Sequence, residues 1–233
     1  EPLSIYAANV TIKGFKISRS GQSSMEDFAA LKVYNTRQVV IEDNILDDNF
    51  FGIYLQNARN CTVRGNRLQA YGRIEQRLGN GIHAWKCDSI SICNNKIVGH
   101  RDGIYLEFVT HTQVVDNQSL NNLRYGLHFM FSHDNAYLRN AFTKNGAGVA
   151  VMYTKRVLME DNIFNENWGD AAYGLLLKDI TDSHITHNHF TNNTTAIYME
   201  GGIRINMHRN NFQGNGWAIR IMASSTDNFF TQY

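Results

Sequence analysis

An asparagine recurs at nearly fixed spacing along most of this 233-residue chain, and it limits the possible folds more than any other feature. Nine repeats each begin with a small residue, and in eight of them an asparagine stands fourteen residues later. A period in the twenties, with short strands and no helical pattern, is typical of a solenoid. The small residues are Ala30, Gly52, Gly81, Gly103, Gly126, Gly148, Gly174, Ala196 and Ala218, and the asparagines are Asn44, Asn66, Asn95, Asn117, Asn140, Asn162, Asn188 and Asn210.

Apolar residues alternate within each repeat, which predicts short strands with one buried face. In the second repeat, Ile53 and Leu55 stand one and three positions after the small residue, and Val63 and Leu68 follow at eleven and sixteen. Three such strands per turn, separated by bends, predict an all-β fold. We expect one domain over residues 1–233, a right-handed parallel β-helix of the pectin-lyase-like kind with about 22 residues per coil.

The asparagines have a structural explanation. Sharp bends between strands often need left-handed backbone, which Asn tolerates. Stacked amides can also hydrogen-bond from one coil to the next and satisfy buried polar groups. We therefore interpret this ladder as structural. A second, looser ladder contains Asn49, His100, Asn122, Asn145, Asn167, Asn193 and Asn215.

Two insertions interrupt the period, at residues 70–80 and 167–173. Insertions in solenoids fall at bends and often build the binding face. The pattern begins within a repeat, and neither end carries a clear polar cap. We therefore expect this sequence to be part of a longer protein, or an end to be covered by another protein.

Charge, hydropathy and cysteine content exclude several classes of function. The formal net charge of +1 gives no broad basic surface for nucleic acid, and no apolar run approaches the roughly 18 residues of a membrane span.

Cys61 falls on an inward position, which predicts a small core residue. Cys87 and Cys93 share a coil and can pair, bind metal or be inert, although the lack of paired Cys-x-x-Cys motifs disfavours zinc.

Two outward-facing columns carry a mixture of soft ligands and aromatic rings. They lie two and four positions after each small residue, so they share one face of the strands. Met130 and Met152 hold the same place on successive coils, about 4.8 Å apart, and His128 lies two residues before Met130. Thioether and imidazole ligands together suit Cu(I), and His133 can add a donor. The alternative is that these side chains only cover a groove or meet a protein partner.

Three segments resemble the NosD family of periplasmic β-helix proteins: residues 124–135 (RYGLHFMFSHDN), 146–153 (GAGVAVMY) and 166–179 (ENWGDAAYGLLLKD). The resemblance runs along most of the chain. It implies a periplasmic accessory protein, without catalytic activity, that serves copper-site maturation of nitrous oxide reductase. The implied partners are an ABC transporter made of an ATPase and a membrane subunit, a copper chaperone lipoprotein, and apo nitrous oxide reductase. The implied cargo is transient Cu(I), with sulfur as an alternative.

We expect partners to dock around the proposed copper ligands. Aromatic neighbours can shield Cu(I) from water or anchor a partner. The expected docking residues are His83, Trp85, Tyr105, Glu107, Phe131, Trp168 and Asp170.

The competing hypothesis is a β-helix that binds or processes polysaccharide as a lyase, epimerase or hydrolase. Such enzymes place paired carboxylates, Lys or Arg in an open groove, and the candidates are Glu107, Asp170, Lys178 and Glu200. The Asp-Pro-His-Asp segment that alginate epimerases carry is absent from the sequence. A third hypothesis is a purely structural, adhesin-like solenoid.

Overall fold

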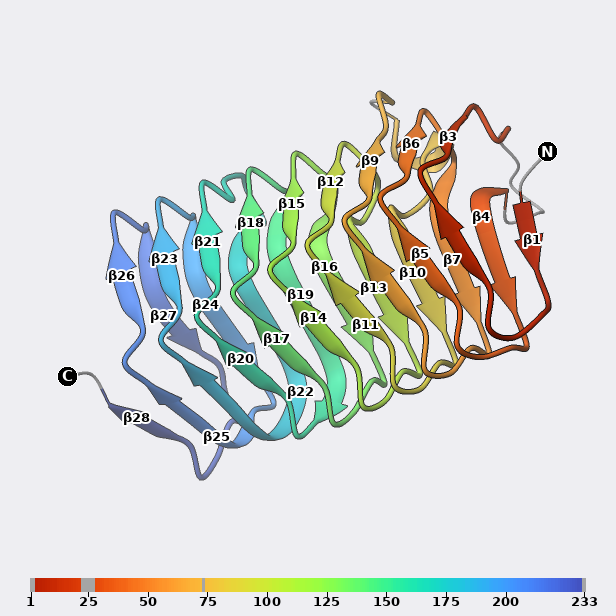
Figure 1. Ribbon diagram of the computed structural model, residues 1–233. Helices are drawn as coiled ribbons and strands as arrows, with labels where there is room; N and C mark the ends of the chain where they lie inside the picture. The colour runs from red at the N-terminus through yellow and green to blue at the C-terminus, as the bar shows by residue number, and fades with distance from the viewer. Residues whose placement is uncertain (1–2, 22–27, 73, 232–233) are drawn as a thin grey trace.

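The computed structural model describes residues 3–21, 28–72 and 74–231, and it confirms the predicted right-handed parallel β-helix of about nine turns (Figure 1). Each coil contributes up to three strands, which pair in parallel with the equivalent strands of the coils above and below. The expected period of about 22 residues per coil is also confirmed.

The strands form three series along the solenoid. The first contains β1 (Leu3–Ile5), β4 (Ala29–Tyr34), β7 (Phe51–Gln56), β10 (Ile82–Trp85), β13 (Ile104–Glu107), β16 (Tyr125–Met130), β19 (Ala147–Lys155), β22 (Tyr173–Thr186), β24 (Thr195–Glu200) and β27 (Trp217–Ile221). The second contains β2 (Thr11–Lys13), β5 (Val40–Glu42), β8 (Thr62–Arg64), β11 (Ser91–Cys93), β14 (Gln113–Val115), β17 (Ala136–Leu138), β20 (Leu158–Glu160), β25 (Ile203–His208) and β28 (Phe229–Thr231). The third contains β3 (Lys16–Ser18), β6 (Ile45–Asp47), β9 (Arg67–Gln69), β12 (Lys96–Val98), β15 (Gln118–Leu120), β18 (Ala141–Thr143), β21 (Ile163–Asn165), β23 (His189–Thr191) and β26 (Asn211–Gln213).

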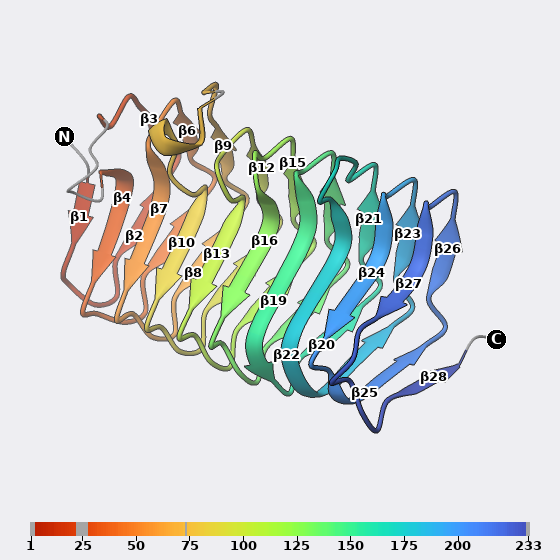
Figure 2. The ribbon, with the colours of Figure 1, turned by 180° about the vertical axis from the view of Figure 1, so that it is seen from behind.

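The first two series form one 19-stranded sheet, because the long strand β22 pairs with members of both. The third series forms a separate nine-stranded sheet. Figure 1 shows the third series toward the viewer, and Figure 2 shows the first series from the opposite side. The two sheets enclose a continuous apolar core. Along it Phe142, Phe164 and Phe190 stack from coil to coil, with ring centroids 5.5 and 4.5 Å apart.

The asparagine ladder is buried and connects the coils by hydrogen bonds, as predicted. The Asn140 amide donates to the carbonyl of Val114 at 2.8 Å and to Asn162 Oδ1 at 3.0 Å. The expected left-handed backbone, however, is one residue earlier: Arg139 has φ 53° and Asp161 has φ 56°. The residue before each asparagine makes the bend, the asparagine's own backbone is not left-handed, and its amide bonds across the coil junction.

Both insertions directly precede a strand of the first series. In the first insertion, residues 74–80 include the 3₁₀ helix η1 (Glu75–Arg77) and lead into β10, and in the second, residues 167–173 lead into β22. Figure 2 shows both on the edge where the first-series strands begin. The insertions therefore flank the beginnings of the strands that carry the outward columns.

The three cysteines are free thiols. Cys61 is buried, as predicted, and Cys87 and Cys93 do not pair with each other. Burial raises the pKa of Cys87 to about 12, which keeps that thiol protonated. Within the described ranges, no helix has the length and apolar character needed to cross a membrane.

Candidate metal centre

The strand register brings the two predicted methionines together. Glu107, Met130 and Met152 are paired neighbours on β13, β16 and β19, and both methionines are half-buried. The expectation that they are adjacent on a partly exposed face is therefore confirmed. The hydroxyl of Tyr105 donates to Met130 Sδ at 3.6 Å. Burial, reinforced by the Glu107 carboxylate, raises the pKa of Tyr105 to about 12, so this phenol remains a donor.

His128 occupies the predicted column but is not exposed as expected. Its side chain is only 7% exposed, because the rings of Tyr105 and Tyr125 pack against it at centroid distances of 4.8 and 4.7 Å. An outward-facing side chain in a β-helix is thus buried when larger neighbours from adjacent coils and bends cover it. His128 Nε2 is buried and has no hydrogen-bond partner among the described residues.

Asp102 holds His128 in a defined orientation. Its carboxylate is 1% exposed and lies 3.4 Å from His128 Nδ1. A carboxylate oxygen only accepts, so Nδ1 carries the proton and Nε2 keeps the lone pair in the neutral ring. The same carboxylate accepts the backbone N–H of Tyr125 at 3.4 Å. Histidines that bind metals are commonly oriented in this way, by a carboxylate on the other ring nitrogen.

His133 lies apart from this group. It follows the corner at Phe131, where φ is 50°, and lines a separate hollow of about 200 Å³ together with Tyr153, Lys155 and Asp179. Burial and the nearby Lys155 lower its pKa. The sharp corner between the first and second strands turns His133 away from the face that carries Met130.

The expected docking residues fall into different environments. His83 is enclosed by the rings of Phe51, Tyr54 and Tyr105 at 5.5, 4.9 and 4.8 Å, and burial, reinforced by Arg101, lowers its pKa to about 3. His83 is nevertheless half-buried rather than fully buried, and so is Tyr105. The other expected residues, Trp85, Glu107, Phe131, Trp168 and Asp170, are partly or fully exposed.

An exposed row of aromatic rings borders the methionines. Phe131 stacks between Phe108 and Tyr153, and its ring centroid lies 5.2 Å from that of Phe108 and 5.1 Å from that of Tyr153. All three have left-handed backbone, with φ of 50–54°, which is unusual for bulky residues. Equivalent corners in other coils carry Asn57 and Gly201, which suit that backbone better.

The insertion before β22 forms the rim at the other end of β16. Trp168 is 64% exposed, and with Asp170, Arg124 and Tyr125 it lines a hollow of about 290 Å³. The Arg124 guanidinium lies 5.0 Å from the Tyr125 ring centroid, and Tyr125 in turn contacts His128. Packed side chains therefore connect this hollow with the histidine.

Two features of the site, Asp102 and the row of aromatic rings, were not predicted from the sequence. Asp102 directly precedes Gly103, and it is the only charged residue among those that precede the nine small residues. Phe108 and Tyr153 stand five positions after their small residues, where Phe131 also stands. Both features can be found by comparing equivalent positions of the nine repeats. Among the described residues, no three His, Cys, Asp or Glu side chains lie close enough together to hold a metal.

Solved structures with similar folds include several proteins that act on polysaccharides. The periplasmic alginate epimerase AlgG gives a TM-score of 0.73 at 16% identity, over 87% of this chain and 58% of that chain. An exopolygalacturonase from Thermotoga maritima gives 0.63 at 12% identity, over 87% and 55%. PfbA, a surface adhesin of Streptococcus pneumoniae, gives 0.60 at 14% identity, over 94% and 69%. At these identities the likeness shows the fold alone, and the chain spans less than two thirds of the epimerase.

Family comparison is more specific. No curated protein sequence matches the chain significantly. Residues 2–74 match the right-handed beta helix region family. Residues 69–232, well over half of the chain, match the family described as "Periplasmic copper-binding protein (NosD)". This protein belongs to the NosD family.

Proposed function

We propose that this protein is a periplasmic accessory protein that binds Cu(I) and hands it on for copper-site maturation of nitrous oxide reductase. It would work without catalytic activity of its own. Its partners would be an ABC transporter complex of ATPase and membrane subunit, a copper chaperone lipoprotein that supplies the ion, and apo nitrous oxide reductase that receives it. Membership of the family described as periplasmic and copper-binding supports this proposal.

One observation in the structure carries the copper proposal. His128 Nε2 is buried without a hydrogen-bond partner, while Asp102 orients the ring through Nδ1. Met130 lies two residues away on the same face of β16, and Met152 is its neighbour in register on β19. One imidazole and two thioethers form a soft, neutral ligand set, which suits Cu(I). In this proposal His128, Met130 and Met152 hold the ion, and His133 has no part in this site.

The ligand chemistry favours transfer over permanent storage. Thioethers bind without losing a proton, whereas an imidazole binds only when its lone pair is free. Binding of Cu(I) to His128 therefore requires the free lone pair on Nε2, which the hydrogen bond from Nδ1 to Asp102 leaves available. The row formed by Phe108, Phe131 and Tyr153 provides an apolar edge beside the methionines, suited to the buried part of a protein interface.

The test is a Cu(I) titration against a competing chelator. The variant carries Met130→Leu and Met152→Leu, which conserve side-chain volume and remove both sulfurs. A Cys93→Ser background removes the partly exposed thiol, which could otherwise bind Cu(I). We expect Cu(I) affinity to fall at least about tenfold, since two of three proposed ligands are lost.

The matched control replaces two methionines elsewhere, with Met159→Leu in the core and Met222→Leu on the surface. This control should bind Cu(I) as the parent does. If the two double variants bind Cu(I) equally well, the ion is not held by Met130 and Met152.

The geometry disfavours Glu107 and Glu200 as the carboxylate pair of a glycoside hydrolase. Glu107 is on β13 and Glu200 is on β24, four strands apart in the sheet. At about 4.8 Å per strand, their backbones are roughly 19 Å apart. Glycosidases need carboxyl groups about 5 to 9.5 Å apart. Lys178 and Glu200 are instead neighbours in register on the surface, where opposite charges contribute little.

A further inference from the structure

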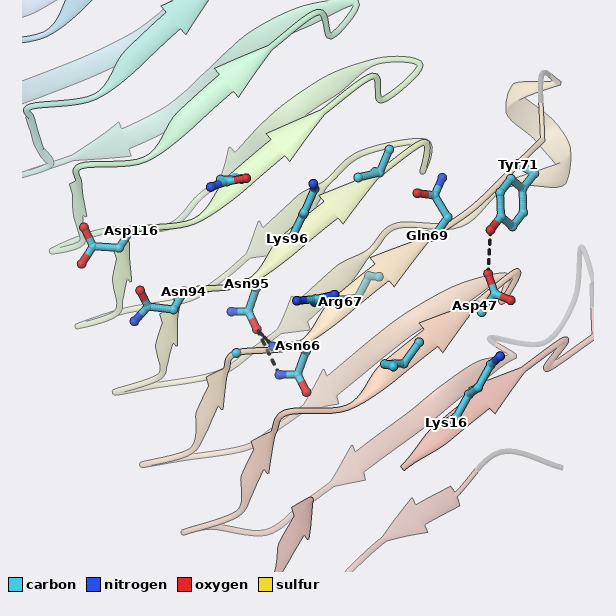
Figure 3. Close-up of a pocket in the computed structure, with 15 residues that line it drawn as sticks. Lys16, Asp47, Asn66, Arg67, Gln69, Tyr71, Asn94, Asn95, Lys96 and Asp116 are labelled. Carbon is cyan, nitrogen blue, oxygen red and sulfur yellow. Dashed lines mark hydrogen bonds between the residues drawn. The ribbon is translucent and has the colours of Figure 1, made fainter. Parts of the chain in front are cut away.

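A hollow lies on the nine-stranded sheet, on the opposite side of the solenoid from Met130. It has a volume of about 760 Å³ and is open to solvent over β3, β6, β9, β12 and β15. Figure 3 shows Lys16, Arg67 and Lys96 along the hollow, with Tyr71 at one margin and Asp116 at the other. This volume is within the range of small-molecule sites, roughly 300 to 1,000 Å³.

The three cations of the hollow share one column of the sheet. Lys16 pairs in register with Ile45, Ile45 with Arg67, and Arg67 with Lys96. All three cations are exposed, and none forms an ion pair with any described residue. At about 4.8 Å per strand, Arg67 and Lys96 are one step apart and Lys16 is two steps from Arg67.

The carboxylates of the hollow do not neutralise these cations. Asp47 accepts a hydrogen bond from the Tyr71 hydroxyl at 2.9 Å. Asp116 is held by the Arg139 guanidinium through two contacts of 2.9 and 3.1 Å. The column therefore keeps its positive charge.

Like charges directly opposite each other on neighbouring strands destabilise a sheet. Arg67 and Lys96 stand in this relation, and the cost needs a compensating gain. Beyond Gln118 the column continues with Ala141, Ile163, His189 and Asn211, so its lysine and arginine side chains are confined to the hollow. A bound anion would offset the repulsion.

The rest of the lining indicates what kind of anion fits. Gln69, Asn94 and Gln118 offer amide groups, and Asp47 offers carboxylate oxygens, which suit hydroxyl groups of a ligand. Tyr71 is 65% exposed and presents an apolar ring at the margin. A dense polyanion would be repelled by Asp47, which has no cationic partner among the described residues. A chain with widely spaced carboxylates and many hydroxyls would use every group in the hollow.

We propose that this hollow binds an acidic oligosaccharide of uronic acid residues, laid along the solenoid axis with its carboxylates on Lys16, Arg67 and Lys96. The site is distinct from the proposed copper site and independent of it. Binding would be non-catalytic and would fix the protein to an acidic glycan while the methionine face stays accessible.

Calorimetric titration of the full chain with hexamers of galacturonate and of mannuronate tests this proposal. The site variant is Arg67→Gln with Lys96→Gln. The control, Arg77→Gln with Arg209→Gln, changes the net charge equally at two exposed residues without ion pairs among the described residues. We expect at least one hexamer to bind, at least about tenfold more weakly to the site variant than to the control, because charge-assisted hydrogen bonds are lost. Added salt should weaken binding.

Four results would each overturn the proposal. They are failure of both hexamers to bind at millimolar concentration, equal losses in the site and control variants, equal binding of a methyl-esterified hexamer, and equally tight binding of hexa-aspartate. Melting temperatures of both variants establish that they fold. The Cu(I) titration of the site variant should match that of the parent, so this proposal and the copper proposal can fail separately.

Discussion

Replacing Asp102 with asparagine tests whether the buried carboxylate sets the metal-binding state of His128. The amide is nearly the same size, so the core around it should be retained. Its NH₂ group can donate to Nδ1, which moves the ring proton to Nε2 and removes the lone pair that would bind Cu(I). We therefore expect Asp102→Asn to weaken Cu(I) binding even though Asp102 does not contact the ion in the proposed site.

The size of the effect follows from the contact. Loss of a second-sphere partner typically weakens metal binding by about 10- to 100-fold, equivalent to about 1.4 to 2.8 kcal/mol. His128 Nδ1 and Asp102 Oδ2 are 3.4 Å apart, beyond the usual range of about 2.7–3.2 Å for such bonds. A contact of this length favours the lower end of the 10- to 100-fold range, so we expect Cu(I) affinity to fall about tenfold.

The assay is a chelator-competition titration arranged as a double-mutant cycle. It compares Asp102→Asn and His128→Gln, singly and combined, with Asp116→Asn as a surface control. If Asp102 acts through His128, adding Asp102→Asn to His128→Gln should change Cu(I) affinity no further. Thermal melting of each variant checks the fold.

Two outcomes would refute the reasoning. One is unchanged Cu(I) affinity in Asp102→Asn when His128→Gln binds weakly. The other is additive losses in the combined variant, which would mean that Asp102 acts without His128.

Two further predictions concern buried polar groups of the ladders. The buried His100 ring makes no hydrogen bond of good geometry among the described residues, although it faces the Gly79 backbone, and burial lowers its pKa from 6.5 to about 4. Between these two pKa values the unfolded chain binds more protons than the folded chain, so the free energy of unfolding falls as pH falls. His100→Asn should raise the free energy of unfolding by about 1 kcal/mol and reduce the loss of stability between pH 7 and 5, both measured by urea denaturation. An unchanged dependence of stability on pH would contradict this. Asn140→Ala should cost about 3 kcal/mol, because Val114 and Asn162 lose their donor. Asn165 makes only an exposed contact, so Asn165→Ala should change the free energy of unfolding by no more than about 0.5 kcal/mol in the same assay. Equal losses of stability in Asn140→Ala and Asn165→Ala would show that the ladder does not stabilise the coils.

The repeat made the register of the site predictable. A residue and its counterpart one repeat later become neighbours across strands, so the pairing of Met130 with Met152 followed from counting. The path of the chain at corners was less predictable. His133 is only three residues from Met130, yet the left-handed backbone at Phe131 directs it to a different hollow.

The sequence alone therefore determined the coil, its core and the columns, because these depend on period and on which residues are apolar. Burial of the outward side chains was decided by the folded arrangement. Whether His128 meets water depends on Tyr125, on Tyr105 from the preceding coil and on Asp102 at a bend. These contacts join residues whose proximity cannot be predicted from the pattern of a single strand. They depend on the volumes of the side chains that neighbouring coils bring together.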